Sequence, residues 1–287
     1  MLKQRIITAL VLLLILLPAM FYHSPVPFAL IAMLLIAAGA WEWARLNAYG
    51  PTTSLLAGLL CGLGCAVSWW FGMLESSSSQ LLLWIVAGAA WVLGGAWVLR
   101  AGVSAWSGFP RAVRLSAGLL ALWLAWLAVA QAKVIGANFL LSVLALVWAA
   151  DISAYFAGRR FGGRFIGRKL APAISPGKSW EGVWGGMAGV VGLAGLWRWV
   201  DAAWALTVPS WFTHLGSQGI WLLLVAIVFM VAMSVVGDLF ESLVKRSAGV
   251  KDSSALLPGH GGVLDRVDAL LPTLPLALML YSLLKPG

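Results

Sequence analysis

Nine stretches of about twenty mostly apolar residues run along the chain, and they limit its fold more than any other feature. A helix needs about 20 apolar residues to cross the hydrocarbon core of a bilayer. Only 10% of the 287 residues are charged, whereas a soluble domain carries roughly 25%. The sequence therefore predicts an all-α integral membrane protein with about nine transmembrane helices. The predicted spans are residues 5–22, 27–46, 54–74, 80–99, 115–132, 137–157, 182–200, 219–237 and 266–284.

The positions of the basic residues predict how these spans are oriented. With a cytoplasmic N-terminus, 16 of the 19 lysines and arginines fall on the cytoplasmic side, and only Lys133, Arg198 and Lys285 fall on the other. An excess of cytoplasmic cations is the general rule for membrane proteins. Nine spans then place the C-terminus on the opposite side. No small-residue cleavage site follows segment 6–21, so we interpret this segment as a retained span and not as a signal peptide.

Net charge narrows the class of partner. In a soluble protein a charge of +9 would suggest nucleic acid. In a membrane chain the cation excess follows from topology, and it also favours anionic lipid headgroups and phosphate substrates. We therefore expect the bilayer as a partner and no nucleic acid.

Polarity divides the chain into two regions. Residues 1–136 form an N-terminal region of five spans with short connections. Residues 137–287 form a C-terminal region whose cytoplasmic loops, 158–181 and 238–265, carry acidic and basic residues together. The seventh span is rich in glycine, which permits close approach of a neighbouring helix. We expect any chemistry in the C-terminal region.

Acidic residues gather at one end of the predicted helices. Of ten in the chain, only Glu75 and Asp201 fall on the outer side. An ionisable residue in or near a span is costly unless it is paired or functional, so the other eight are candidates for a site. The sequence leaves Glu42 and Glu181 open between a structural and a functional role. The eight are Glu42, Asp151, Glu181, Asp238, Glu241, Asp252, Asp265 and Asp268.

The densest group of polar residues lies at the end of the eighth span. Four of them recur at positions i, i+3, i+4 and i+7, which form one face of a helix. A solvated face with i, i+4 charge pairs is the alternative, but this stripe begins at the membrane end, where solvation gives no reason for it. The stripe is Asp238, Glu241, Ser242 and Lys245, followed by Arg246.

A glycine-rich loop, Pro258-Gly259-His260-Gly261-Gly262, follows after Lys251 and Asp252. Its backbone N–H groups can approach phosphate oxygens closely. Asp265 and Asp268 then share one helix face, with Arg266 between them. Together with Asp238 they are placed to converge on a divalent cation, because Mg²⁺ is held by one or two carboxylates plus substrate phosphates. For His260 we favour a loop or phosphate contact over a role as nucleophile or base.

A second cluster precedes the seventh span. Asp151, Tyr155 and Arg159 end the sixth span, and Ser175 and Lys178 lie in the following loop. A positive-inside loop explains the arginines, but it does not explain the aspartate. Gly177-Lys178-Ser179 has the form of a P-loop end, but residue 172 is proline where glycine is required, and we expect no strand before it. We reject a P-loop.

These segments resemble the phosphatidate cytidylyltransferases, also called CDP-diacylglycerol synthases. The C-terminal pattern of that family joins Ser-x-x-Lys-Arg, Lys-Asp, Pro-Gly-His-Gly-Gly and Asp-Arg-x-Asp, and residues 242–268 match it. Its Asp-x-x-Ala-Tyr-Phe-x-Gly-Arg and Ile-Ser-Pro-x-Lys-Ser-Trp-Glu-Gly segments match residues 151–159 and 174–182. The N-terminal five spans agree only in number and hydrophobic character.

The resemblance implies transfer of the cytidylyl group from CTP to phosphatidic acid, which gives CDP-diacylglycerol and pyrophosphate for phospholipid biosynthesis. It implies Mg²⁺ bound by Asp238 and Asp265, with K⁺ nearby, in a homodimer of the bacterial inner membrane whose active site faces the cytoplasm. The catalytic residues would be Asp238, Lys245, Asp265 and Asp268. The substrate-binding residues would be Asp151, Tyr155, Arg159, Ser175, Lys178, Glu241, Ser242, Arg246, Lys251, Asp252, His260, Gly261, Gly262 and Arg266.

The chemistry needs no nucleophilic triad, because a phosphomonoester with a second pKa of about 6 is already anionic at neutral pH. Two other functions stay open. A CDP-alcohol phosphotransferase also uses aspartates on membrane helices, but its motif requires Gly and Ala-Arg after the second aspartate, where this chain has Ala269-Leu270. An ion-coupled transporter would place its acids near the bilayer midplane, often within repeats. Here the acids gather at one face.

Overall fold

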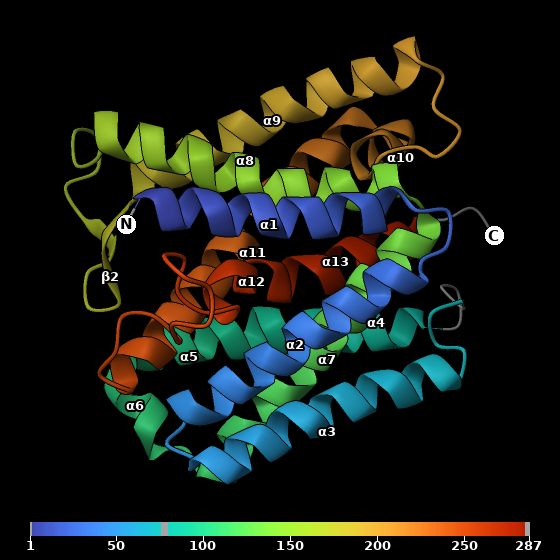
Figure 1. Ribbon diagram of the computed structural model, residues 1–287. Coiled ribbons are helices and arrows are strands. Elements are labelled where there is room, and N and C mark those ends of the chain that lie inside the picture. Colours follow the sequence, from blue (N-terminus) through green and yellow to red (C-terminus); the bar gives the residue numbers. More distant parts are fainter. Residues whose placement is uncertain (1, 76–79, 285–287) are drawn as a thin grey trace.

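The computed structural model describes residues 2–75 and 80–284 as a bundle of long helices that run back and forth between two ends (Figure 1). The N-terminus, the β-hairpin and α6 lie at one end, and the C-terminus lies at the other. The elements are α1 (Leu2–Phe21), α2 (Val26–Leu46), α3 (Pro51–Trp70), α4 (Leu81–Ala89), the π-helical turn η1 (Ala90–Gly94), α5 (Gly95–Ala101), α6 (Val103–Gly108), α7 (Arg111–Ile135), α8 (Ala137–Phe161), β1 (Lys169–Ala171), β2 (Ser175–Ser179), α9 (Trp180–Ala203), α10 (Trp211–Gln218), α11 (Ile220–Ser247), α12 (Leu264–Val267) and α13 (Leu270–Leu283).

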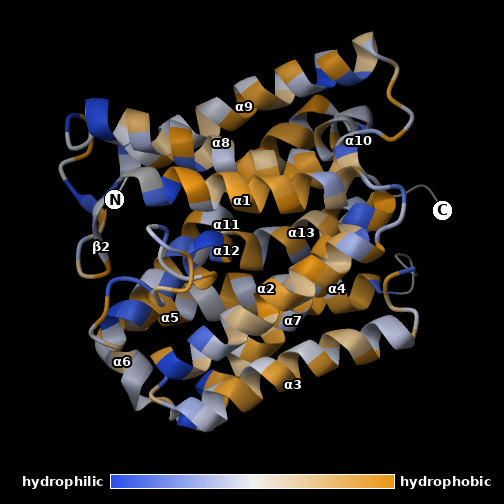
Figure 2. Ribbon diagram, viewed as in Figure 1, coloured by the Kyte–Doolittle hydropathy of each residue, from blue (hydrophilic) through white to orange (hydrophobic). Residues whose placement is uncertain are grey.

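The apolar helices confirm an all-α membrane protein. Within the described residues, eight helical segments are long and apolar enough to cross a membrane, with α4–α5 and α12–α13 each counted as one. The predicted seventh span corresponds to α9, whose 24 residues extend about 36 Å, but it is not among the eight. The count of nine therefore stays a prediction. Figure 2 shows hydrophobic residues along the helices and hydrophilic ones gathered at the hairpin end.

A short hairpin connects α8 to α9, and here the sequence expectation of no strand was wrong. β1 and β2 pair antiparallel, with Lys169 opposite Ser179 and Ala171 opposite Ser175. The strands have three and five residues. β1 is shorter than the four to eight residues over which alternation indicates a strand, and β2, Ser-Pro-Gly-Lys-Ser, has no apolar–polar alternation.

The glycines of α9 allow it to lie directly against α8. A Cβ atom added to Gly185 would collide with Ala157, and one added to Gly189 would collide with Ser153. These contacts agree with the close helix approach predicted from the glycine content. They hold the start of α9, and with it the end of the hairpin, beside the polar end of α8.

A buried carboxylate joins three helices at the opposite end of the bundle. Asp201, at the end of α9, accepts hydrogen bonds from Asn138 Nδ2 at 2.9 Å, Ser210 N at 3.0 Å and Thr213 Oγ1 at 2.6 Å. These contacts fix the beginnings of α8 and α10. They lie at the end of the helices where none of the candidate site residues is found.

Asp201→Asn is expected to lower stability without changing the chemistry of the protein. The side-chain amide of the new asparagine would turn its N–H groups toward the hydrogen-bond donors that now face the carboxylate. Leaving such a buried group without a partner costs about 1–3 kcal/mol. Thermal unfolding in detergent measures the loss. A variant as stable as the wild type would show that the Asp201 hydrogen bonds contribute nothing.

Candidate active site

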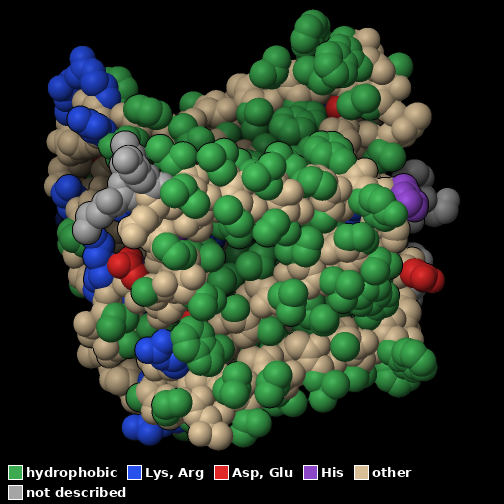
Figure 3. Space-filling view, in the orientation of Figure 1, with side chains coloured by type: hydrophobic (Ala, Val, Ile, Leu, Met, Phe, Trp, Pro, Cys, Tyr) green, Lys and Arg blue, Asp and Glu red, His purple; other side chains and the backbone are tan. Residues whose placement is uncertain are grey.

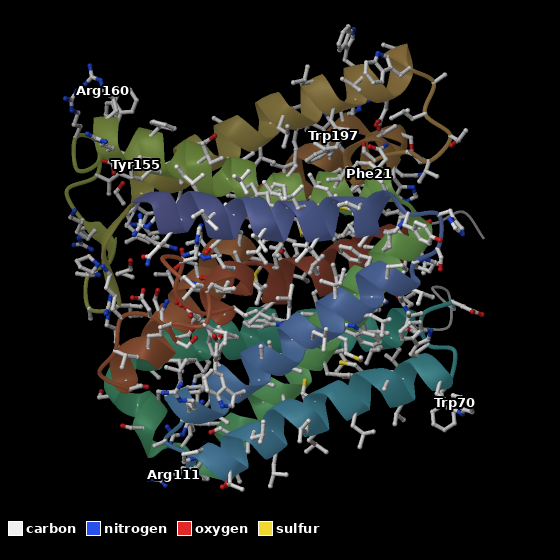
Figure 4. All side chains as sticks on the ribbon, in the orientation of Figure 1. Phe21, Trp70, Arg111, Tyr155, Arg160 and Trp197 are labelled. Carbon is white, nitrogen blue, oxygen red and sulfur yellow. The ribbon has the colours of Figure 1, made fainter. Side chains whose placement is uncertain are left out.

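A cavity of about 500 Å³ lies at the hairpin end, between α8, α9, α11 and β2. Five of the predicted site residues line it. Val183, Gly186, Val231 and Val235 add an apolar part to its wall. Figure 4 shows Tyr155 and Arg160 at this end of α8, beside the hairpin. The five lining residues are Asp151, Tyr155, Arg159, Lys178 and Asp238, whereas Ser175 is not in the lining.

An ion pair crosses this cavity from the hairpin to α11. Lys178 Nζ lies 2.5 Å from Asp238 Oδ2, and Ser242 Oγ donates to Asp238 Oδ1 at 3.2 Å. Both side chains of the pair stay partly exposed, Lys178 by 25% and Asp238 by 32%. Asp151 lies close enough to both to interact electrostatically. The cavity therefore presents one ammonium, the Arg159 guanidinium and two carboxylates that an incoming phosphate can reach.

A second, more deeply buried ion cluster lies one helical turn further along α11. Lys245 Nζ lies 2.5 Å from Glu241 Oε2 and 2.6 Å from Asp265 Oδ1. The exposed fractions are 12% for Lys245, 1% for Glu241 and 7% for Asp265. The i, i+4 pair follows from helix geometry, but the contact with Asp265 depends on the packing of α11 against the segment before α13.

Asp265 also organises the loops around it. Its Oδ2 accepts hydrogen bonds from Ser253 N at 2.9 Å, Ser253 Oγ at 2.9 Å and Gly262 N at 2.7 Å. Gly261 has φ +84°, in the left-handed region that favours glycine, and an added Cβ would lie 2.6 Å from Asp265 Oδ2. The glycine-rich loop (residues 258–262) is therefore closed tightly onto this carboxylate.

The crossing of α11 and α13 brings two more aspartates together. A Cβ on Gly237 would lie 2.5 Å from the backbone oxygen of Asp268 and 2.9 Å from the ring of Pro272. This close approach places Asp268 within electrostatic reach of Asp238, the residue after Gly237. Asp268 Oδ1 accepts a hydrogen bond from Ala269 N at 2.7 Å. Asp238 and Asp268 thus lie near each other, and their convergence with Asp265 on a cation stays a prediction.

Other predicted substrate-binding residues contact backbone in this structure. Arg246 donates to the carbonyl oxygens of Ile174 and Val250, each at 3.3 Å. Arg266 Nε donates to the carbonyl oxygen of His260 at 3.0 Å. These contacts support the loops. Lys251 and Asp252 are exposed, His260 is half-buried, and Arg159 donates to the Tyr155 hydroxyl at 3.2 Å.

The structure gives contacts to the two glutamates whose roles the sequence left open. Glu181, ahead of the predicted span 182–200, accepts hydrogen bonds from Ile166 N at 2.9 Å and Phe165 N at 3.1 Å. These backbone donors, Ile166 first, lower the pKa of Glu181 to about 2, so it is ionised at neutral pH and holds the loop before β1. Glu42 is fully buried against the segment that carries Asp265. In the sequence, the only indication that Glu42 has a role was the position of a charged residue inside a predicted span.

The donor set suits a divalent cation held together with phosphates. In the described part of the chain, no three Asp, Glu, His or Cys side chains are grouped tightly enough to hold a metal by themselves. Glu241 Oε1 is buried and has no hydrogen-bond partner there. Asp265 Oδ1 has Lys245 as its only hydrogen-bond donor among the same residues. The local excess of carboxylates over lysines would repel a polyanion unless a cation accompanied it.

Basic residues surround this end of the molecule. Figure 3 shows lysine and arginine side chains gathered along the edge that carries the hairpin. Arg160, Arg164, Arg168 and Lys169 are exposed there, together with Phe165. The cavity therefore opens in a basic setting, as a binding site for anionic molecules requires.

Comparison with known proteins agrees with this site. The sequence pattern of the cytidylyltransferase family matches residues 3–284. The chain is 41% identical over 279 residues to the phosphatidate cytidylyltransferase of Pseudomonas aeruginosa, covering 96% of this chain and 95% of that one. It is 39% identical to the Haemophilus influenzae enzyme of the same name, covering 96% of each, and 36% identical to that of Brucella abortus, covering 94% and 89%. The chain therefore belongs to the cytidylyltransferase family, and it is a nucleotidyltransferase.

Proposed function

We propose that the protein transfers the cytidylyl group of CTP to phosphatidic acid, forming CDP-diacylglycerol and pyrophosphate. The observation that carries this proposal is the pair of lysine–carboxylate clusters at one end of the helices, beside a cavity open to anions. A lipid headgroup can enter there while its acyl chains stay among apolar helices. The names of the relatives supply the two substrates.

The reaction needs little covalent help from side chains. A phosphatidate oxygen attacks the α-phosphorus of CTP, the bond from that phosphorus to the bridging α–β oxygen breaks, and pyrophosphate leaves with the electron pair. The attacking oxygen is already deprotonated near neutral pH, so no general base is required. Positioning and charge stabilisation provide the catalysis, as in other phosphoryl transfers.

The lysines are the groups suited to stabilise that charge. Lys178 lines the cavity and can move from Asp238 to a phosphate oxygen over a short distance. Lys245 is largely buried, and an ammonium in a poorly solvated site interacts more strongly with a developing negative charge. We assign Lys178 to substrate phosphates and Lys245 to the transition state.

Magnesium belongs to this proposal. Asp238 and Asp265 would hold the ion, with Asp268 nearby, and K⁺ stays a further prediction. When bound, Mg²⁺ would neutralise phosphate charge and stabilise the leaving pyrophosphate. Hydrogen bonds from Ser253 and Gly262 fix the position of Asp265, which supports this part of the proposal.

We further propose that the hairpin end faces the cytoplasm of a bacterial inner membrane, where CTP is available. The asymmetric placement of lysines and arginines supports this orientation. A homodimer is expected from the family resemblance. Cross-linking in native membranes tests the homodimer, and detection of the monomer alone would contradict it.

Transfer of label tests the function. With purified protein, Mg²⁺, phosphatidate and α-³²P-labelled CTP, we expect label in the lipid fraction and release of pyrophosphate, with neither when phosphatidate is omitted. A CDP-alcohol phosphotransferase or a transporter would release no pyrophosphate from CTP. With CTP carrying a chiral α-thiophosphate, a single displacement inverts that phosphorus, and retention would contradict the direct attack.

Lys178→Gln is expected to lower kcat/KM by about 10- to 100-fold, the effect of losing one hydrogen bond to a charged group. Because Lys178 is partly exposed, the fold should tolerate the change. Initial rates at varied CTP and phosphatidate measure the effect. Rates equal to those of the wild type would remove Lys178 from the substrate site.

A further inference from the structure

Glu42 lies in α2, in the N-terminal region that contributes none of the predicted catalytic residues. Its side chain has an exposed fraction of 0%. Its carboxylate accepts three hydrogen bonds, all from the segment that surrounds the glycine-rich loop. The donors are Ser254 Oγ at 2.5 Å, Val263 N at 3.0 Å and Leu264 N at 2.8 Å. The Ser253 hydroxyl lies 3.3 Å from Glu42, but its one proton is donated to the closer Asp265 at 2.9 Å.

Two of these donors are backbone N–H groups at the start of the α12–α13 span. The first N–H groups of a helix have no carbonyl partner within the helix. Glu42 accepts from Val263 and Leu264 there, and its negative charge interacts favourably with the helix dipole. A side chain from a helix more than 200 positions earlier in the sequence thus caps the helix that carries Asp265.

The contact set requires a carboxylate at this position. All three partners donate, and an ionised carboxylate offers only acceptors. Glutamine has nearly the same shape, but its NH₂ group would face at least one of the donors. Space is restricted as well, because a Cβ on Gly262 would collide with Ser253 Oγ and Glu42 Oε1.

Glu42 and Asp265 hold the same loop from two sides. Ser253 Oγ lies within hydrogen-bond distance of both carboxylates, at 3.3 Å from Glu42 Oε2 and 2.9 Å from Asp265 Oδ2. Gly262 N donates to Asp265, and the next two N–H groups donate to Glu42. The orientation of Asp265 toward Lys245 therefore depends on the anchorage of this loop by α2.

We infer that Glu42 is a positioning residue, which holds Asp265 and, through it, Lys245 in the geometry that the reaction uses. Its kinetic consequence rests on the proposed function. Its structural consequence, protection of the Val263 and Leu264 amides, does not.

The test compares Glu42→Gln with Asp201→Asn, a matched removal of a buried carboxylate at the opposite end of the bundle. Both variants should lose thermal stability. Only Glu42→Gln should lower kcat, by roughly 10- to 100-fold, the usual effect of losing a group that orients catalytic residues. The KM for CTP should stay close to that of the wild type, because Glu42 is not among the residues lining the cavity. Hydrogen–deuterium exchange of residues 262–265 should quicken in Glu42→Gln alone.

Several outcomes would overturn the inference. They are a wild-type kcat in Glu42→Gln, an equal loss of kcat in Asp201→Asn, and unchanged exchange at residues 262–265. If Glu42→Gln does not fold, Ser254→Ala removes only one donor and should lower kcat by roughly fivefold; no loss would count against the role. If the wild type transfers no label, the proposed function fails, while the exchange experiment still decides whether Glu42 holds the loop.

Discussion

Asp265→Asn is expected to lower kcat by about 10²- to 10³-fold, the effect of removing one preorganised charged or polar group from a transition-state site. Asp265 accepts from four donors, one on Oδ1 and three on Oδ2. An asparagine must turn its NH₂ group toward at least one of them. The variant would lose the contact with Lys245 or release the glycine-rich loop, and it would also lose half of the proposed Mg²⁺ site.

The measurement is the initial rate of label transfer from CTP to lipid, per folded protein. Asp201→Asn provides the control, because it makes the same chemical change in a buried aspartate far from the cavity. We expect the control to transfer label at the wild-type rate. An Asp265→Asn variant that does the same would remove Asp265 from the catalytic site.

Lys245→Met is expected to abolish activity and to lower the free energy of unfolding by about 3–5 kcal/mol. The stability loss arises because Glu241 and Asp265 would stay buried without their common cation, and breaking a buried pair leaves an uncompensated charge. Loss of Lys245 would leave Glu241 with fewer partners than Asp265. Glu241 Oε1 has no hydrogen-bond partner in the described part of the chain, whereas Asp265 retains Ser253 and Gly262.

A double variant separates the two effects of Lys245. Lys245→Met with Glu241→Gln removes one buried negative charge together with the positive one. We therefore expect it to recover much of the stability, as measured by thermal unfolding in detergent, but to transfer no label. A single variant as stable as the wild type would show that the buried cluster does not contribute to folding. An active double variant would show that Lys245 is not catalytic.

The sequence predicted the parts of the site that depend on local geometry. The stripe from Asp238 to Lys245 was predicted from helix periodicity, and its i, i+4 pair, Glu241 with Lys245, is present. The helical spans could be predicted because each helix satisfies its own backbone hydrogen bonds. The length of a hydrophobic segment is therefore enough to indicate a membrane-spanning helix. The hairpin was missed because β1 has only three residues and β2, Ser-Pro-Gly-Lys-Ser, has no apolar–polar alternation.

Tertiary structure alone decided which of these residues meet. Lys178 reaches Asp238, and Lys245 reaches Asp265, because the hairpin, α11 and α13 converge at one end of the bundle. No sequence spacing predicts that convergence, since it depends on close helix approaches such as the one at Gly237. The structure also shows that Arg246 and Arg266, which the family resemblance implies are substrate-binding residues, contact backbone carbonyls in this structure.

By itself, the sequence determined that this chain is a helical membrane protein with its acids and cations gathered at one end, and its motifs indicated the family. Hydrophobic length, helix periodicity and charge asymmetry are local properties, and they can be evaluated before any contact is known. Only the tertiary structure decided the partners of each charge, above all the partners of Glu42. A buried carboxylate in α2 is stable only where donors surround it, and those donors come from a segment more than 200 residues away.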